Sequence, residues 1–172
     1  MIDQPRASHL ASQAFDFWQA GKALEAVPLY EQALLLADPE HYGLSGCHGE
    51  YASVLSDLGN FAEARKQLEK DLILSLAQGE AEGSSSVVIA RYFLAEHLLT
   101  EKEPQLALNA ITPSMIGGIE LEWLLRYSSA IALKALGRET EARAEALLAL
   151  HTAKSDKKRS ELAELLAKSN LV

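Results

Sequence analysis

Cys47 and His48 come closest to a catalytic pair, because a thiol beside an imidazole is how cysteine nucleophiles are activated. The stretch from Gly43 to Cys47 also approaches the G-x-S-x-G nucleophile-elbow pattern. Cys47, however, stands where that pattern needs glycine, and no strand precedes it. Adjacent side chains on a helix also point about 100° apart. The sequence therefore predicts no catalytic residue, and we expect a protein that is not an enzyme.

The histidines do not form a metal-binding pattern. Neither an H-E-x-x-H motif nor a pair four residues apart occurs among His9, His41, His48, His97 and His151. The single cysteine excludes an intramolecular disulfide and a multi-cysteine metal site. The sequence contains no phosphate loop and no dinucleotide fingerprint. We therefore expect no metal and no cofactor.

Acidic residues are concentrated in the first half of the chain. The formal net charge is −8; residues 1–90 carry 13 acidic and 5 basic residues, whereas residues 91–172 carry 11 of each. A negative charge disfavours nucleic acid and anionic membranes as partners. The acidic half either keeps the protein soluble or steers a basic partner toward it.

The first ten residues lack the basic start and apolar core of a secretory signal, and no apolar run is long enough to span a bilayer. Together with the single cysteine, these features predict a soluble, cytoplasmic protein.

The elements that must position any functional residue are helices. Leucine and alanine account for 30 and 27 of the 172 residues, whereas valine, isoleucine and threonine together account for 16. Apolar residues recur with a helical period almost throughout. The pattern, read with its Gly and Pro interruptions, predicts helices over about 7–20, 24–37, 47–58, 61–77, 87–100, 104–111, 120–136, 140–153 and 156–169.

Three of the turns between these helices are near copies. The sequences are GKALEAV at 21–27, GNFAEAR at 59–65 and GRETEAR at 137–143, and KEPQLAL at 102–108 is a weaker fourth copy. This pattern resembles the tetratricopeptide repeat (TPR), a helix–turn–helix unit of 34 residues. The resemblance implies an all-α fold, an α-α superhelix of about four TPR-like helix pairs followed by a C-terminal capping helix.

The same resemblance implies one solenoid domain over 1–172, with units at about 7–40, 45–78, 87–119 and 120–153 and the cap at about 156–169. The small packing residues of the family match Ala14, Ala52, Ala95 and Ala130 in the first helices, and Ala26, Ala64, Ala107 and Ala142 in the second. The third unit departs from the pattern, since its second helix is short and its turn lacks glycine. That unit is either a tolerated decayed repeat or a local opening used by a partner.

TPR-like pairs commonly bind a peptide or a partner helix on a concave groove lined by the first helices. The resemblance places the following residues in that groove: Phe15, Trp18, Glu50, Ser53, Arg91, Tyr92, Glu96, Arg126, Tyr127 and Lys134. The family members that clamp a chaperone's C-terminal carboxylates have Lys and Asn where this sequence has Ala11 and Phe15. A cochaperone role is therefore disfavoured.

Two groove features keep two interpretations each. The Arg91–Tyr92 step recurs as Arg126–Tyr127, and the pair could form a basic, aromatic patch that holds an acidic or aromatic side chain. Alternatively, each arginine packs between helices or pairs with Glu96, Glu120 or Glu122. Trp18 is either repeat core or an exposed anchor.

We therefore expect a non-enzymatic adaptor, chaperone or assembly factor that binds a protein or peptide in its groove. Short free-standing arrays of this kind in bacteria resemble secretion chaperones and toxin-neutralising partners. A self-assembling structural module, a homo-oligomer, is the alternative.

Overall fold

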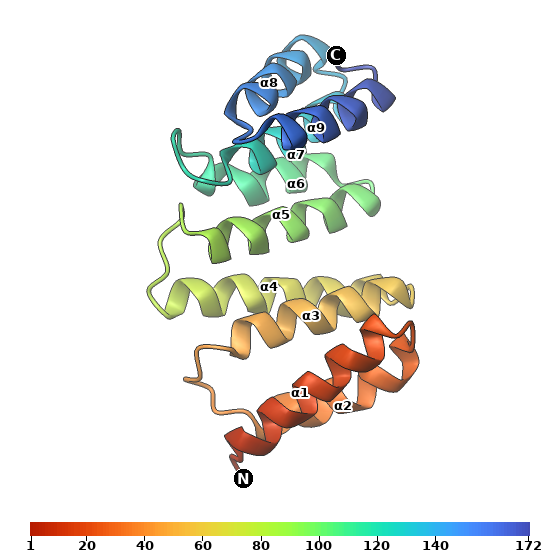
Figure 1. The fold of residues 1–172 in the computed structure, drawn as a ribbon, viewed down its shortest axis with the longest axis vertical. Helices are drawn as coiled ribbons and strands as arrows, with labels where there is room; N and C mark the ends of the chain where they lie inside the picture. The colour runs from red at the N-terminus through yellow and green to blue at the C-terminus, as the bar shows by residue number, and fades with distance from the viewer. The chain divides into compact units, whose positions relative to one another are not determined.

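The computed structural model describes all 172 residues as nine α-helices and one 3₁₀ turn, with no strand (Figure 1). The elements are α1 (Gln4–Gln19), α2 (Ala23–Leu36), α3 (Leu44–Asp57), α4 (Phe61–Ala77), α5 (Ser85–Thr100), α6 (Pro104–Ile111), η1 (Thr112–Ser114), α7 (Glu122–Ala135), α8 (Glu139–Thr152) and α9 (Asp156–Lys168). The all-α prediction is confirmed. None of the helices combines the length and the apolarity needed to cross a membrane.

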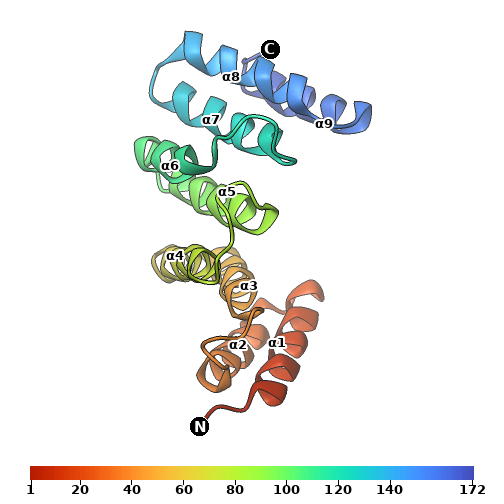
Figure 2. The ribbon, with the colours of Figure 1, turned by 90° about the vertical axis from the view of Figure 1, so that its left-hand side faces the viewer.

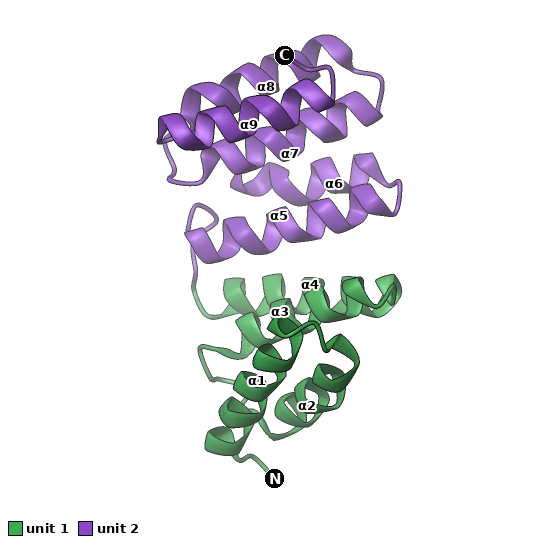
Figure 3. Ribbon diagram, turned by 45° about the vertical axis from the view of Figure 1, so that its right-hand side comes forward, with its two compact units in different colours: residues 1–79 green, residues 80–172 purple.

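The chain divides into two compact units, Met1–Gly79 and Glu80–Val172 (Figure 3). In unit 1, α1 packs against α2 and α3 against α4; in unit 2, α5 packs against α6 and α7 against α8. Figure 2 shows α9 beside α8, as the cap proposed from the sequence requires. The grouping of all four pairs into one solenoid domain stays a prediction.

The four turns inside the helix pairs share one hydrogen-bond arrangement. In the first, the Gly21 amide donates to the Trp18 carbonyl and the Lys22 amide to the Phe17 carbonyl, at 2.9 Å each. The bonds that correspond to Lys22–Phe17 run from the Asn60 amide to the Leu55 carbonyl, from Glu103 to Leu98 and from Arg138 to Leu133, at 2.8, 2.8 and 2.9 Å. This is the Schellman closure of a helix, which needs one residue with positive φ.

Glycine supplies that residue in three turns, with φ of 75° at Gly21, 77° at Gly59 and 74° at Gly137. In the third pair Lys102 adopts the same conformation, with φ of 63°. A non-glycine residue is strained there. The turn of the weakest repeat therefore keeps the geometry of the others although it has lost the residue that favours it.

The packing residues predicted from the repeat lie in the core of their own pair. All eight are completely buried: Ala14, Ala26, Ala52, Ala64, Ala95, Ala107, Ala130 and Ala142. A methyl group at these points lets the two helix backbones approach closely. In unit 1 the space beside them is filled by Tyr30 and Tyr51, whose rings stack with centroids 5.6 Å apart.

Unit 2 ends in a second apolar cluster. Leu162 and Leu166 of α9, with Leu171 after it, pack on Ala146 and Ala149 of α8. The Ser155 hydroxyl caps α9 by accepting a hydrogen bond from the Lys158 amide. The capping helix thus covers an alanine face that would otherwise lie open to water.

Helix α1 begins three residues earlier than predicted. The Asp3 carboxylate accepts a hydrogen bond from the Arg6 amide at 3.2 Å, and Pro5 lies in the first turn. Both features are typical helix-start signals. Helix α3 likewise begins at Leu44 rather than at Cys47.

Candidate functional site

The Cys47 thiol lacks the properties of a nucleophile. Burial, with a smaller contribution from the Glu50 carboxylate, raises its pKa to about 12. The neighbouring His48 ring is buried, and its Nδ1 lies 2.6 Å from the Gln67 Oε1. Because the Gln67 amide nitrogen donates to Glu63, its oxygen faces His48, and Nδ1 is the donor. His48 therefore pairs with Gln67 rather than with Cys47, and Cys47 packs against the core of unit 1.

Arg91 is directed into unit 2. Its side chain makes two hydrogen bonds to the Glu82 carboxylate, Nε to Oε2 at 2.8 Å and Nη2 to Oε1 at 2.7 Å. Its Nη1 donates to the Ala110 carbonyl of α6 at 2.7 Å, and the residue is only 7% exposed. The Ser114 hydroxyl donates to the same carboxylate. All three guanidinium nitrogens of Arg91 thus donate a hydrogen bond. These bonds join α5 to the loop before it and to the end of α6.

Arg126 occupies the corresponding place on α7 and is also paired. It contacts Glu122 one turn earlier and Glu145 of α8, at 3.1 Å each. Glu122 in turn accepts a hydrogen bond from the Gly118 amide. In the structure, both arginines therefore follow the packing alternative rather than forming an open basic patch.

The tyrosines that follow these arginines lie in a different environment. Tyr92 and Glu96 are one turn apart on α5, and Tyr127 and Ser128 lie on α7, which packs against α5. The Ser128 hydroxyl donates to the Glu96 Oε1 at 3.3 Å. Tyr92, Glu96 and Tyr127 are each only partly buried. We call these four residues the Tyr–Glu–Tyr cluster.

Burial and the charge of Glu96 shift the pKa values of the residues in the cluster. Burial raises the pKa of Glu96, and the Ser128 hydrogen bond only partly opposes this effect. The pKa values of Tyr92 and Tyr127 are raised first by burial and then by the Glu96 charge. Both phenols are therefore neutral at physiological pH. The cluster thus combines one carboxyl group with two uncharged phenol rings.

Lys134, two turns beyond Tyr127, does not reach this carboxyl group. Its ammonium donates to the Ser169 carbonyl at the end of α9. The assignment of Lys134 to a groove with Tyr127 stays a prediction.

In unit 1, the predicted groove residues of α1 form an aromatic pair. Phe15 and Trp18 meet edge to face with centroids 5.9 Å apart, and Phe15 is 38% exposed. The Trp18 Nε1 donates to the Asp57 carboxylate of α3 at 2.7 Å. Trp18 is thus partly buried against the unit 1 core, with its polar edge held by α3.

The predicted residues of α3 bond within unit 1. The Tyr30 hydroxyl donates to the Glu50 carboxylate at 3.0 Å, and burial raises the pKa of Glu50. The Ser53 hydroxyl donates to the Gly49 carbonyl one turn earlier. The Tyr30–Glu50 bond joins α2 to α3, whereas the Ser53 bond lies within α3.

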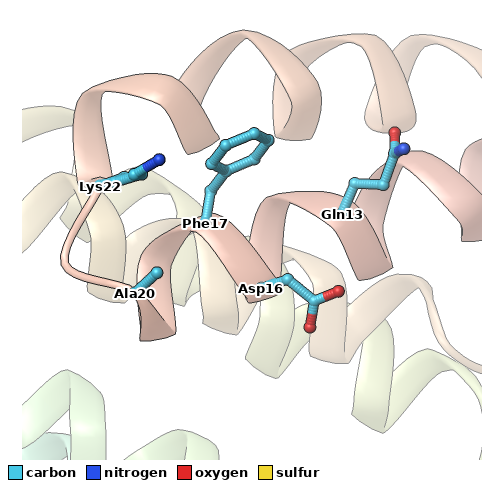
Figure 4. Close-up of a pocket in the computed structure, with 5 residues that line it drawn as sticks. All are labelled: Gln13, Asp16, Phe17, Ala20 and Lys22. Carbon is cyan, nitrogen blue, oxygen red and sulfur yellow. The ribbon is translucent and has the colours of Figure 1, made fainter.

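The end of the first helix pair carries a shallow pocket of about 280 Å³, lined by Gln13, Asp16, Phe17, Ala20 and Lys22. The Lys22 ammonium lies 5.5 Å from the centre of the Phe17 ring. Figure 4 shows the five side chains spread along the end of α1 and the turn, without a common point toward which they converge. Ligand sites combine an apolar wall with converging polar groups, and this pocket lacks the second feature.

Sequence reasoning missed three partners that define these environments: Glu82, Ser128 and Asp57. Glu82 lies in a Gly- and Ser-rich connector, which gave no reason to expect an ion pair. Ser128 and Asp57 meet their partners across 32 and 39 residues, respectively, so only the packed helices bring them together.

The elements define a class of fold: an all-α protein built of helix pairs. Comparison with solved structures confirms the TPR-like, α-α superhelical fold. A kinesin light chain structure from Podosopora anserina with nearly identical TPR-like repeats is 18% identical with a TM-score of 0.71, covering 98% of this chain and 96% of that one. BtubC (BKLC) from P. vanneervenii is 17% identical with a TM-score of 0.71, covering 88% and 64%.

MamA MSR-1 C2 is 17% identical with a TM-score of 0.60, and the match covers 96% of this chain and 88% of that one. No protein-family model matches the sequence, and no curated protein is significantly similar to it. At these identities the likeness extends to the fold alone.

Proposed function

We propose that the protein is a non-enzymatic interaction module that binds a peptide or a partner protein on the first-helix face of unit 2. The observation that carries this proposal is the Tyr–Glu–Tyr cluster. Three other acids of unit 2, Glu82, Glu122 and Glu145, pair with Arg91 or Arg126. The half-buried Glu101 lies 3.7 Å from the His97 ring nitrogen. The Glu96 carboxyl group has only a serine hydroxyl. A partly exposed acid between two tyrosines is suited to contact with another molecule.

The fold supports the same proposal. The first helices of TPR-like pairs line the face on which such proteins bind extended or helical segments. The specific role proposed is that of an adaptor, an assembly factor, a secretion chaperone or a toxin-neutralising partner. The cytoplasm is the proposed compartment, consistent with a single cysteine whose thiol is free.

Site-directed photo-crosslinking in cells of the source organism tests the proposal. A photoreactive phenylalanine replaces Phe93, which is 48% exposed beside Tyr92, and in a control it replaces Arg143, on the outer surface of α8. We expect a discrete crosslinked protein from position 93 that is absent from position 143. Equal labelling from both positions, or labelling from neither, contradicts the proposal.

Self-assembly is the second candidate, and exposed apolar side chains favour it. Leu147 of α8 is 62% exposed and Leu165 of α9 is 44% exposed, close to the C-terminal end of unit 2. Such residues on adjacent helices could be covered by another copy. Light scattering across a wide concentration range decides: a concentration-dependent mass that Leu147→Lys abolishes supports assembly, and a constant monomer mass excludes it.

A further inference from the structure

The Glu96 carboxyl group is the half-buried acid of unit 2 that the fold leaves without a basic partner. Its single hydrogen bond, from the Ser128 hydroxyl, is 3.3 Å long. The nearby basic side chains are engaged elsewhere: Arg91 with Glu82, Arg126 with Glu122 and Glu145, and Lys134 with the Ser169 carbonyl. Partial burial of a carboxylate without a cation is unfavourable, so a positive charge brought by another molecule would be bound favourably here.

The groups around Glu96 favour a cation of a particular shape. Tyr92 lies one turn before Glu96 on α5, and Tyr127 precedes Ser128, the hydrogen-bond partner of Glu96, on α7. Both phenols are neutral, and the charge of Glu96 contributes to raising the pKa of each. The faces of such rings attract cations, and a planar guanidinium can also stack on them. A compact ammonium gains less from two rings, because it cannot stack.

Apolar side chains extend from the cluster along both helices. Leu99 lies one turn beyond Glu96 on α5, and Ile131 lies one turn beyond Tyr127 on α7; both are partly buried. The aliphatic stem of a long basic side chain is commonly covered by such surfaces while its charged end reaches a carboxylate.

We propose that the Tyr–Glu–Tyr cluster is the binding site for one arginine side chain of the partner protein. The guanidinium pairs with the Glu96 carboxylate and lies against the rings of Tyr92 and Tyr127. This inference rests on the proposed interaction function and specifies the chemistry of the partner. Arg91 and Arg126 already pair with glutamates of unit 2, and the partner's arginine would pair with Glu96 in the same way.

The direct test uses the amide of N-acetyl-arginine as the probe and follows the full-length protein by NMR. We expect saturable shifts of the Glu96 carboxyl and of the Tyr92 and Tyr127 ring signals in the millimolar range. The uncharged isostere, N-acetyl-citrulline amide, and an equal concentration of sodium chloride should leave these signals in place. Equal shifts with citrulline or with salt overturn the proposal.

Variants assign the binding to the cluster. Glu96→Gln keeps the shape and the serine hydrogen bond while removing the charge, and should weaken probe binding at least tenfold. Glu120→Gln is the matched control, because Glu120 is an exposed acid of the same unit. Tyr127→Leu should weaken binding about fivefold through the lost ring. Unchanged affinity in Glu96→Gln, with intact circular dichroism, overturns the proposal.

The two proposals fail in different ways. If a partner is crosslinked from position 93 but Glu96→Gln binds the probe as well as the wild type does, the arginine site is overturned. The interaction function is then still supported. A probe that binds at Glu96 without any crosslinked partner supports the site and overturns the interaction function.

Discussion

Arg91 and Glu82 form a two-bond ion pair that fastens the connector before α5 to the interior of unit 2. The two bonds measure 2.7 and 2.8 Å, and the arginine also holds the Ala110 carbonyl. The sequence alone left open whether Arg91 binds a partner or packs within the fold. Its burial and its three bonds assign it a structural role.

Replacing Arg91 by Ala should therefore destabilise unit 2. The substitution leaves the Ala110 carbonyl without its donor and Glu82 without its cation, and we expect a loss of about 2–3 kcal/mol in the free energy of unfolding. Urea unfolding followed by circular dichroism measures it. Arg143→Ala, which breaks an exposed pair with Glu139 one turn away, should cost less than about 0.5 kcal/mol. A comparable loss in both variants would show that the Arg91 pair contributes no more than a surface pair.

Asp71 should make the stability of unit 1 depend on pH. Burial raises the pKa of this carboxyl to about 7, with a partial offset from Ser75, against 3.8 for an ordinary aspartate. The folded state then binds a proton that the unfolded state has already lost. The contribution of Asp71 to the free energy of unfolding is therefore greatest below pH 4 and declines as the pH rises toward 7. The decline is a few kcal/mol at most, since one pKa unit corresponds to about 1.4 kcal/mol.

Asp71→Asn tests this dependence, because an amide stays neutral at every pH. The variant should unfold at a higher urea concentration than the wild type at pH 8 and at a similar one at pH 4. Asp16→Asn, an exposed acid on α1, is the control. A constant difference between Asp71→Asn and the wild type from pH 4 to 8 rules out titration of Asp71 in that interval.

Gly49 and Asp71 should be energetically coupled. A Cβ atom at Gly49 would lie 2.6 Å from the Asp71 Oδ2, closer than van der Waals contact allows. Gly49→Ala should therefore destabilise the wild type. In an Asp71→Ala background the clash is gone, and the same substitution should stabilise α3 by up to about 1 kcal/mol through helix propensity. The double-mutant cycle measures this change of sign, and additive effects would show that the two residues are independent.

Lys102→Gly should stabilise unit 2. Lys102 has a φ of 63°, a conformation that costs a non-glycine residue about 1 kcal/mol and costs glycine little. We expect a gain of that order in thermal or urea unfolding. Gly137→Ala is the reciprocal change at the matching turn of the next pair, where φ is 74°, and should lose a similar amount. A loss in both variants would mean that the lysine side chain itself stabilises the turn.

Most of the fold was predictable because its signals are local. Glycine turns, prolines and the helical period predicted all nine helix ends and seven of the nine helix starts to within two residues. The buried alanines followed from the repeat. The early start of α1 was also visible in the sequence, since Asp3 and Pro5 form a cap and a first turn. The repeat pattern alone did not predict the turn conformation at Lys102, where the backbone has a positive φ although the residue is not glycine.

The candidate site was predictable only in part. Position in the repeat assigned Tyr92 and Tyr127 to equivalent places on α5 and α7, which contact each other. It could not distinguish them from Arg91 and Arg126, which precede them by one residue and point into the unit. That difference depends on Glu82 and Glu145, whose side chains reach the arginines only after the helices have packed.

The two tryptophans are divided between the two compact units. Trp18 belongs to unit 1 and donates to Asp57, and Trp123 belongs to unit 2, with the Lys158 ammonium 5.2 Å from its ring. Each unit therefore carries its own fluorophore in a distinct electrostatic setting. In the single-tryptophan variants, emission follows one unit at a time: Trp123→Phe leaves Trp18 to report on unit 1, and Trp18→Phe leaves Trp123 to report on unit 2. The order in which the two units unfold can then be measured by fluorescence.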